Sequence, residues 1–355
     1  MNTHTIDTST PVIPADAYDT TAFYAHPDTI ATVTNTTAPD AVPLPSPDAP
    51  TSELLAAAQE AGRRAVPAPL AETALVARPL LGRVGLPVPD GPLSYAIDPE
   101  LTIRYAHPGA SAVGSAGCSG DDDTLLVTGT LRRVPWGRSA TAVVVLATAP
   151  SGPVLFAIAP DRAVVTHGGN LAEEPRDDFH LAALEVPAAQ VRRISPELLD
   201  EARLRAALVR SALIAGAAER CVELTVDHTT ARTQFGRPLS RFQAVKQEEA
   251  RLIEEAALVR AAVQAAAAPL DAGGPAAHVA VAAAKTQASA SAAEIARIAH
   301  QLHGAIGITR LNPLHLATTR LWSWRDEDGD EIHWARRLAR PLTATTLWPT
   351  LTTTP

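Results

Sequence analysis

The residue types best suited to binding a ligand lie in the segment Arg-Thr-Gln-Phe-Gly-Arg-Pro, at residues 232–238, between two stretches of helical pattern. Its glycine and proline end a helix, so the guanidinium of Arg232 and the amide of Gln234 fall in a loop. An arginine at a helix end binds phosphate through paired, charge-assisted hydrogen bonds. Loops of arginine and glycine that only end a helix are more common, so the segment alone indicates no ligand.

A second segment, Gln-Leu-His-Gly-Ala-Ile-Gly-Ile-Thr at residues 301–309, combines small residues with the end of a predicted helix. Gly304, Ala305 and Gly307 add little side-chain bulk, so a planar ligand or another backbone can approach closely. Taken alone, this pattern is better explained as a glycine cap at the end of a helix, followed by a turn.

An acidic run, Asp-Glu-Asp-Gly-Asp-Glu at residues 326–331, is similar to the start of a calcium-binding loop. The glycine stands at position four instead of six and Arg337 occupies position twelve, so the calcium pattern is not met. His300 and His303 lie three residues apart on one predicted helix, but no third ligand is evident. We therefore expect no metal site.

Together, the first two segments are far more specific than either alone. Arg-x-Gln-Phe-Gly-x-Pro-x4-Gln, followed by Gln-Leu-His-Gly-Ala-x-Gly-Ile-Thr, resembles the C-terminal domain of the acyl-CoA dehydrogenases. The resemblance is close over residues 196–340, looser over 100–190 and poor at the N-terminus. It implies an α+β fold with an N-terminal helical region, a central antiparallel β domain and a C-terminal four-helix bundle, and in this chain the N-terminal helical region is expected to be truncated.

The resemblance also implies FAD as the cofactor and an assembly of at least two chains. In the family, the arginine of the first motif contacts the FAD pyrophosphate of a neighbouring subunit, and the second motif lines the adenosine and pyrophosphate end. Gln243 matches the glutamine of the subunit interface. The expected FAD contacts are Arg232, Gln234, Phe235, Gln301, Gly304 and Ala305.

The catalytic base of the family is a glutamate in a Glu-Gly-Thr type loop, and counting along the chain places it at Asp328, before Gly329. An aspartate is one methylene shorter than a glutamate, and a shift of about 1 Å in a proton-abstracting group costs on the order of 100-fold in rate. Glu327 and Glu331 are alternative bases. Some relatives carry the base on the first bundle helix, but that position falls near Ala206, which cannot accept a proton.

A further departure from the family lies in residues 132–138, where a threonine or serine usually bonds the flavin. Pro135 has no backbone N–H to donate, so this contact must differ. Trp136 is a candidate to stack near the isoalloxazine, and a buried core tryptophan is the alternative.

Hydrophobic periodicity and turn residues divide the rest of the chain. We expect a disordered arm (1–50), a helical region (51–98), a β domain (99–190), a helical bundle (191–341) and a tail (342–355). Within the helical region, the second helix is expected to start at Pro69 and to stop before Pro79. The expected strands are short and antiparallel, and lie at 101–105, 124–128, 142–147, 154–159, 163–166 and 180–186. The expected bundle helices lie at 196–230, 240–268, 275–303 and 328–339, with a short one at 313–319.

Composition narrows the function classes. Of the 355 residues, 46% are hydrophobic and 19% charged, enough for a sizeable core, and the net charge of −8 argues against an obligate nucleic-acid binder. Two cysteines, Cys118 and Cys221, form no disulfide framework, and the first residues show no signal peptide. Without a candidate membrane span, we expect a soluble, cytoplasmic protein.

These observations favour a subunit of an FAD-dependent acyl-CoA dehydrogenase, which forms a double bond between Cα and Cβ of an acyl-CoA thioester and passes electrons to an acceptor. Few residues, about 52–97, are left for the N-terminal helices of the family. The chain therefore looks like the less catalytic partner in an α2β2 heterotetramer of the actinobacterial type, although a homodimer or homotetramer is also open. The alternative functions are a structural subunit that completes a neighbour's FAD site, or an all-helical scaffold that binds other proteins.

Overall fold

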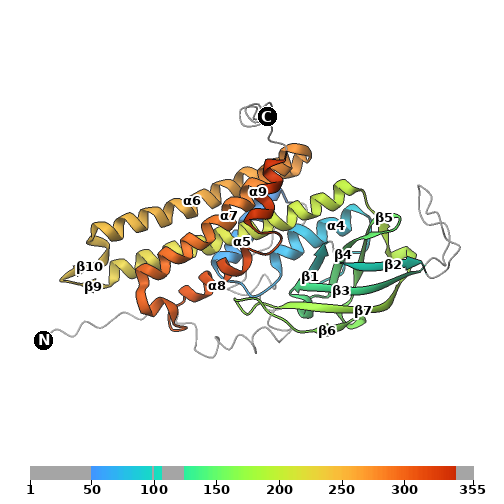
Figure 1. Ribbon diagram of the computed structural model, residues 1–355, viewed down its shortest axis with the longest axis horizontal. Helices are drawn as coiled ribbons and strands as arrows, with labels where there is room; N and C mark the ends of the chain where they lie inside the picture. Colours follow the sequence, from blue (N-terminus) through green and yellow to red (C-terminus); the bar gives the residue numbers. More distant parts are fainter. Residues whose placement is uncertain (1–48, 98–99, 106–123, 341–355) are drawn as a thin grey trace.

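The computed structural model describes residues 49–97, 100–105 and 124–340. Nearly all of the expected arm, the whole of the expected tail and Cys118 lie outside these residues. Figure 1 shows an elongated molecule with a long helical bundle at one end and β sheets at the other. None of the helices in the described part is long and apolar enough to cross a membrane.

In the described part of the chain, five helices follow the β domain and form the bundle. The Ser195 side chain accepts a hydrogen bond from Leu198 N and caps the first of them, with Pro196 in its first turn. Gly273, at a φ of 72°, separates the second from the third. Alanines fill much of the buried surface between these helices, which allows close packing. The five are α5 (Pro196–Ala231), α6 (Gln243–Ala272), α7 (Gly274–His303), α8 (Leu314–Trp324) and α9 (Glu331–Ala339).

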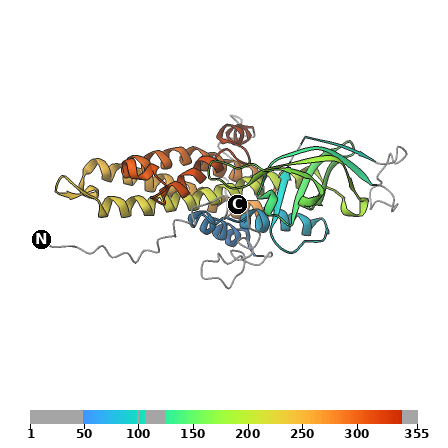
Figure 2. The same cartoon turned by 90° about the horizontal axis from the view of Figure 1, so that it is seen from below.

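Three helical segments precede the sheets: α3 (Thr51–Arg63), the π-helical segment η2 (Glu72–Ala77) and α4 (Arg78–Arg83). They lie along α5, as Figure 2 shows. The prediction that the second helix stops before Pro79 is wrong, because α4 continues through it. Pro79 is the second residue of α4, just beyond the end of η2 at Ala77, where the hydrogen-bond register changes. Its missing N–H is therefore tolerated as in the first turn of a helix.

In its described residues, the β domain consists of two four-stranded sheets in the orders β1-β4-β5-β8 and β2-β3-β7-β6. Its pairs are antiparallel except that β1 runs parallel to β4, which differs from the expected all-antiparallel arrangement. Parallel strands are usually buried on both faces, and here the helices cover one face of the β1–β4 pair. The strands are β1 (Leu93–Ile97), β2 (Leu101–Tyr105), β3 (Leu125–Pro135), β4 (Ala142–Ala149), β5 (Gly152–Ile158), β6 (Val164–Thr166), β7 (Arg176–Val186) and β8 (Arg192–Arg193).

The β1–β4 pair faces two cores. Leu93 and Tyr95 of β1 and Val144 of β4 pack into the core shared with the helices. Val143 and Val145, which point to the other side of the same strand, pack into the core between the two sheets. The sheet therefore packs on both of its faces. This packing holds β1, with the side chain of Tyr95, in place beside the bundle.

Candidate functional site

A pocket of about 590 Å³ opens where the bundle meets the β domain. Its walls come from β1, β3, the loop before β7, α5 and α8, and from the segment between α8 and α9 that carries Asp326, Glu327 and Asp328. The structure therefore brings two of the three candidate bases together in one pocket, and the local surroundings of each decide what it can do chemically.

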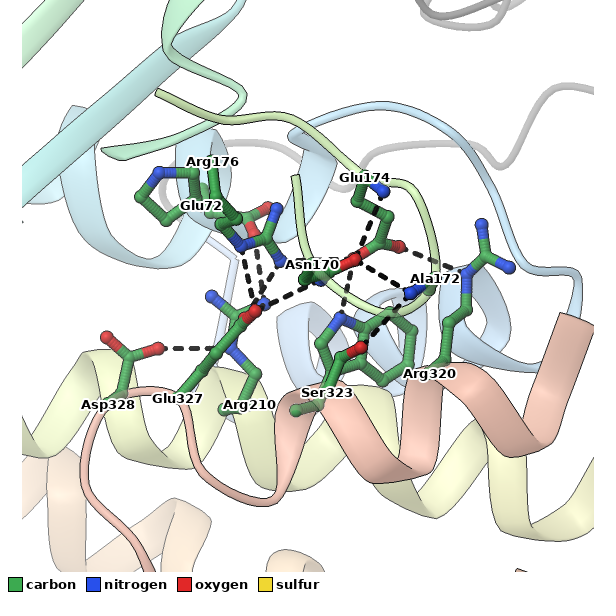
Figure 3. A network of polar contacts seen from close by, with 12 residues as sticks. Glu72, Asn170, Ala172, Glu174, Arg176, Arg210, Arg320, Ser323, Glu327 and Asp328 are labelled. Atoms are coloured by element: carbon green, nitrogen blue, oxygen red, sulfur yellow. Dashed lines mark hydrogen bonds and ion pairs between the residues drawn. The ribbon is translucent and has the colours of Figure 1, made fainter. Parts of the chain in front are cut away.

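Glu327 takes part in a buried ion network, shown in Figure 3. Its carboxylate accepts hydrogen bonds from Arg176 Nε and Nη2, both at 2.8 Å, and from Asn170 Nδ2 at 3.0 Å. Arg210 Nη1 lies 3.3 Å away. Burial alone would raise the pKa of Glu327, but the charges of Arg176 and Arg210 lower it to about 2. The carboxylate is held as an ion and shows little tendency to take up a proton.

Asp328 sits beside it in a tight turn, with a φ of 56° followed by a φ of 95° at Gly329. Its Oδ2 accepts from the Tyr95 hydroxyl at 2.9 Å and from Arg210 Nε at 3.0 Å. The Asp328 carbonyl accepts from Trp334 Nε1 at 2.8 Å. A Cβ at Gly329 would come within 2.5 Å of this nitrogen, so glycine is required at that position. The side-chain carboxylate and the backbone carbonyl of Asp328 are therefore both held by hydrogen bonds.

Arg210 is the centre of the network. Its side chain is 1% exposed, and besides Asp328 and Glu327 it pairs with Glu72 of η2 at 3.3 Å. Burial lowers the pKa of an arginine, but the surrounding carboxylates outweigh it and the pKa of Arg210 is raised. Burial raises the pKa of Glu72. One guanidinium thus joins the N-terminal helical region to the bundle and to the candidate base.

Glu174 extends the network toward α8. Its carboxylate lies 3.0 Å from Arg176 and 3.0 Å from Arg320, and it accepts from Trp324 Nε1 at 2.8 Å. Figure 3 shows Glu174 and Glu327 on either side of Asn170, whose amide donates to both. The acidic segment is therefore tied to β7 and to the loop before it.

Lys285 of α7 holds the end of α8. Its ammonium donates to the carbonyls of Trp324 at 3.1 Å and Arg325 at 2.9 Å, and to Ser289 Oγ at 2.9 Å. A cation at a helix C-terminus satisfies carbonyls that have no partner within the helix. Burial lowers the pKa of Lys285 to about 7. The lysine fixes the point from which Glu327 and Asp328 project.

Glu331 is placed differently from the other two candidate bases. It occupies the first turn of α9, where the helix dipole stabilises a negative charge, and it does not line the pocket. Within the described residues it makes no side-chain hydrogen bond or ion pair. Of the three carboxylates, only Glu331 is unpaired in the described part of the chain, and it lies outside the pocket.

Because the network keeps Glu327 charged, acid should destabilise the protein in part through this residue. The pKa of Glu327 lies below the ordinary value of 4.5, so its stabilising effect is present above that value and is lost as the pH falls toward about 2. We expect the melting temperature of the wild type to fall between about pH 5 and pH 3, and that of Glu327→Gln to fall less. Parallel melting curves for the two proteins over this range would contradict the assignment.

The residues of the Arg232 motif lie at the end of the bundle away from the sheets, in the hairpin of β9 (Thr233–Gln234) and β10 (Arg237–Pro238) (Figure 1). Arg232, Gln234 and Phe235 are all exposed, and Phe235 is 89% exposed. Arg237 stacks on the Phe242 ring at 4.2 Å. Within the described residues the Arg232 guanidinium has no hydrogen-bond or ion-pair partner, so it is available to an anion.

The second motif lies directly beside the first. His303, at the end of α7, stacks on His228 of α5, one turn before Arg232, with ring centroids 4.5 Å apart. Gly304 then ends α7 at a φ of 64°, and Gln301, Gly304 and Ala305 are all exposed. We call the 232–238 hairpin and the 301–309 turn together the bundle tip. All of the expected FAD-contact residues except Trp136 lie at this tip, and Gln243 is also exposed, at the start of α6.

Trp136 is buried, at 2% exposure, and its backbone N–H donates to Pro175 O at 2.9 Å. It does not line the pocket, whereas Pro135 does. The Pro135 carbonyl accepts a hydrogen bond from Ser94 Oγ. This strand therefore offers the pocket no backbone donor at position 135, and its carbonyl there is already engaged.

The sequence interpretation missed most of the network, namely Glu72, Tyr95, Arg176, Arg210 and Lys285. One signal was present: Arg210 interrupts the apolar run Leu-Val-Arg-Ser-Ala-Leu-Ile. A charge within an apolar helix face is rarely buried without a partner. The partners of Arg210 come from three distant segments, which no local pattern connects.

Comparisons with known proteins agree with this geometry. Residues 196–331 match the family model "Acyl-CoA dehydrogenase, C-terminal domain". The acyl-CoA dehydrogenase IpdE2 of Mycobacterium tuberculosis is 40% identical over 112 residues, 31% of this chain and 33% of that protein. FadE34 of the same organism, also an acyl-CoA dehydrogenase, is 32% identical over 295 residues, 81% of this chain and 37% of that protein. The matches thus span about a third of the length of these curated relatives.

Solved structures show the same fold. A chain of the ChsE4–ChsE5 complex from Mycobacterium tuberculosis superposes with a TM-score of 0.72 at 22% identity, over 95% of each chain. Butyryl-CoA dehydrogenase from Megasphaera elsdenii gives 0.67 at 18% identity, over 80% of each chain. The expected α+β architecture, with its helical region, β domain and C-terminal bundle, is confirmed.

Proposed function

Because the chain belongs to the acyl-CoA dehydrogenase family, we propose that it is a subunit of an FAD-dependent enzyme that forms a Cα–Cβ double bond in an acyl-CoA thioester. The observation that carries this proposal is the bundle tip. Two separated motifs of the family meet there through the His228–His303 stack. They leave Arg232 exposed and, among the residues that the structure describes, without an ion-pair partner. FAD, when bound, supplies the acceptor for the hydride that leaves Cβ.

The chemistry of the tip fits the phosphate end of FAD. Arg232 offers a guanidinium to the pyrophosphate, and the Gln234 and Gln301 amides offer further hydrogen bonds. The exposed side chain of Phe235 and the small residues Gly304 and Ala305 give a planar group a surface to approach. These residues would hold and orient the cofactor without taking part in proton transfer.

We further propose that a partner chain completes the site. In one chain, the tip and the acidic segment after α8 lie in different parts of the bundle (Figure 1), so a single ligand needs a second chain to meet both kinds of residue. Two structural neighbours, the ChsE4–ChsE5 complex and the Tcur3481–Tcur3483 steroid acyl-CoA dehydrogenase, are named as assemblies of two components. A heteromeric assembly is therefore the favoured form, and a homodimer or homotetramer is the alternative.

A second candidate role, that of a structural subunit, is favoured by the ion network. A general base needs a pKa near the working pH and a free lone pair within reach of the proton. Glu327 has a pKa of about 2, and Asp328 accepts from both Tyr95 and Arg210. We propose that these carboxylates stabilise the fold and that the partner supplies the base. If Asp328 itself takes the α-proton, its replacement will stop turnover.

The bundle tip is tested by Arg232→Gln, measured as flavin retained by the assembled complex. Losing a charge-assisted contact with a phosphate should lower FAD affinity about tenfold or more. Arg260→Gln serves as the control, since Arg260 lies exposed on α6 of the same bundle and pairs only loosely with Glu219 at 3.6 Å. Equal flavin content in both variants would contradict a phosphate contact at Arg232.

A further inference from the structure

Two arginines at the mouth of the pocket have no role in the function proposed so far. Arg132 and Arg133 of β3 both line the pocket and are both exposed. Within the described residues neither guanidinium makes a hydrogen bond or an ion pair. By contrast, the two arginines deeper in the pocket, Arg176 and Arg210, are fully paired.

The backbone places both arginines on the pocket by means of a β-bulge. The pairing of β3 with β7 shifts between Leu131 and Val134, so that Arg132 and Arg133 together face the single residue Asp178. Arg133 has a φ of 52°, and its N–H donates to Asp178 Oδ1 at 2.7 Å. A bulge lets two consecutive side chains reach the same side of a strand, and a positive φ costs free energy in a residue other than glycine. The strand thus adopts a strained conformation that brings two cations to one pocket.

The same pocket is poorly matched to the flavin ring. Pro135 provides no N–H, and its carbonyl is already bonded to Ser94. The lining includes the charged side chains of Arg210, Glu327 and Asp328. Covering such groups with the face of a large uncharged ring would remove water from them, because the hydrogen-bonding atoms of the flavin ring lie at its edge. The residues present therefore suit the phosphate end of FAD at the tip, and do not suit its ring in this pocket.

We propose that this pocket binds an organic phosphate, with the phosphate on Arg132 and Arg133. Two neighbouring guanidiniums match a dianionic phosphate in both charge and bidentate geometry. At the rim, Leu171 is 64% exposed and Trp322 is 42% exposed, which gives a planar or apolar body a surface to pack on. The ligand class is a nucleotide or the nucleotide portion of coenzyme A. This assignment rests on the proposed function in one respect: the flavin is bound at the bundle tip and not in this pocket.

The test is calorimetric titration of the full chain, at low ionic strength, with ADP, coenzyme A, inorganic phosphate and riboflavin. ADP and coenzyme A are expected to bind. Arg132→Gln and Arg133→Gln are each expected to weaken binding about tenfold, and the double variant to abolish it. Arg104→Gln is the matched control, because Arg104 is an exposed arginine on the neighbouring strand β2, outside the pocket. Melting temperatures show whether each variant is folded.

Tighter binding of coenzyme A than of ADP identifies coenzyme A as the source of the phosphate, and equal binding indicates a nucleotide.

The Arg232→Gln variant separates this proposal from the previous one. If the pocket is the site, ADP binding survives Arg232→Gln and is lost with Arg132 and Arg133. If ADP binding depends on Arg232 alone, the pocket assignment is wrong while the bundle tip is supported. Binding of inorganic phosphate without either organic ligand, binding of riboflavin in the pocket, or no binding by the wild type would each overturn the proposal.

Discussion

Replacing Arg210 with methionine is expected to destabilise the protein by about 3–5 kcal/mol, the cost of leaving buried carboxylates without their cation. Methionine is similar in length and flexible, so the loss will reflect charge more than packing. Glu72 has no other ion-pair partner within the described residues, whereas Glu327 keeps Arg176 and Asp328 keeps Tyr95. The measurement is the free energy of unfolding from chemical denaturation at neutral pH.

Two further variants make this prediction specific. Adding Glu72→Gln to Arg210→Met should recover part of the loss, because it removes the carboxylate that was left unpaired. Arg83→Gln is the control. It breaks a surface pair with Glu201 in which the arginine side chain is 54% exposed, and it should cost less than about 1 kcal/mol. A loss at Arg210 no larger than that at Arg83 would show that the network does not stabilise the fold.

The second large effect is expected at Gly216, where α5 crosses α3. A Cβ at this position would lie 1.8 Å from Gln59 O and 2.6 Å from Arg63 N, both backbone atoms. On the facing helix, a Cβ at Gly62 would lie 2.2 Å from Leu213 O. Because backbone cannot move aside as a side chain does, Gly216→Ala should cost about 3 kcal/mol or more and separate α3 from the bundle. Thermal unfolding measures the effect.

Gly82 in α4 provides the matched substitution. No atom lies within 4 Å of the position of its Cβ, so Gly82→Ala should leave the melting temperature unchanged or raise it, as alanine favours a helix. The predicted contrast is therefore between two alanine substitutions in helices of the same chain. Equal melting temperatures for the two variants would mean that α3 does not pack on α5 as closely as described.

The helices were predictable because their signals are local. Ser195-Pro196 marks the start of α5, and Gly273 and Gly304 follow the ends of α6 and α7, so the expected ranges 196–230, 240–268 and 275–303 differ from the observed ones by a few residues. The strand β1 was missed because the prolines before it indicated only a break. Its register comes from pairing with β4, almost 50 residues later, which no local pattern can show.

The candidate site likewise has one part that could be predicted from the sequence and one part that could not. The bundle tip was predictable as two motifs, because their residue types and spacing are specific even though their contact through His228 and His303 is not visible in sequence. The ion network was not predictable, because Glu72, Arg176 and Arg210 contribute one charge each from different elements. Asp328 could be located by counting, but its engagement by Tyr95 and Arg210 depends on the packing of η2, β1 and α5 around it.

Turnover of the assembled complex carrying Asp328→Asn tests most directly whether this chain supports the cofactor and leaves the base to its partner. Asparagine keeps the shape of aspartate and still accepts from Tyr95 and Arg210, but it cannot take up a proton. We expect the variant complex to retain its flavin and to turn over an acyl-CoA at close to the wild-type rate. A loss of about 100-fold or more, with flavin content and assembly unchanged, would make Asp328 the catalytic base and contradict this account.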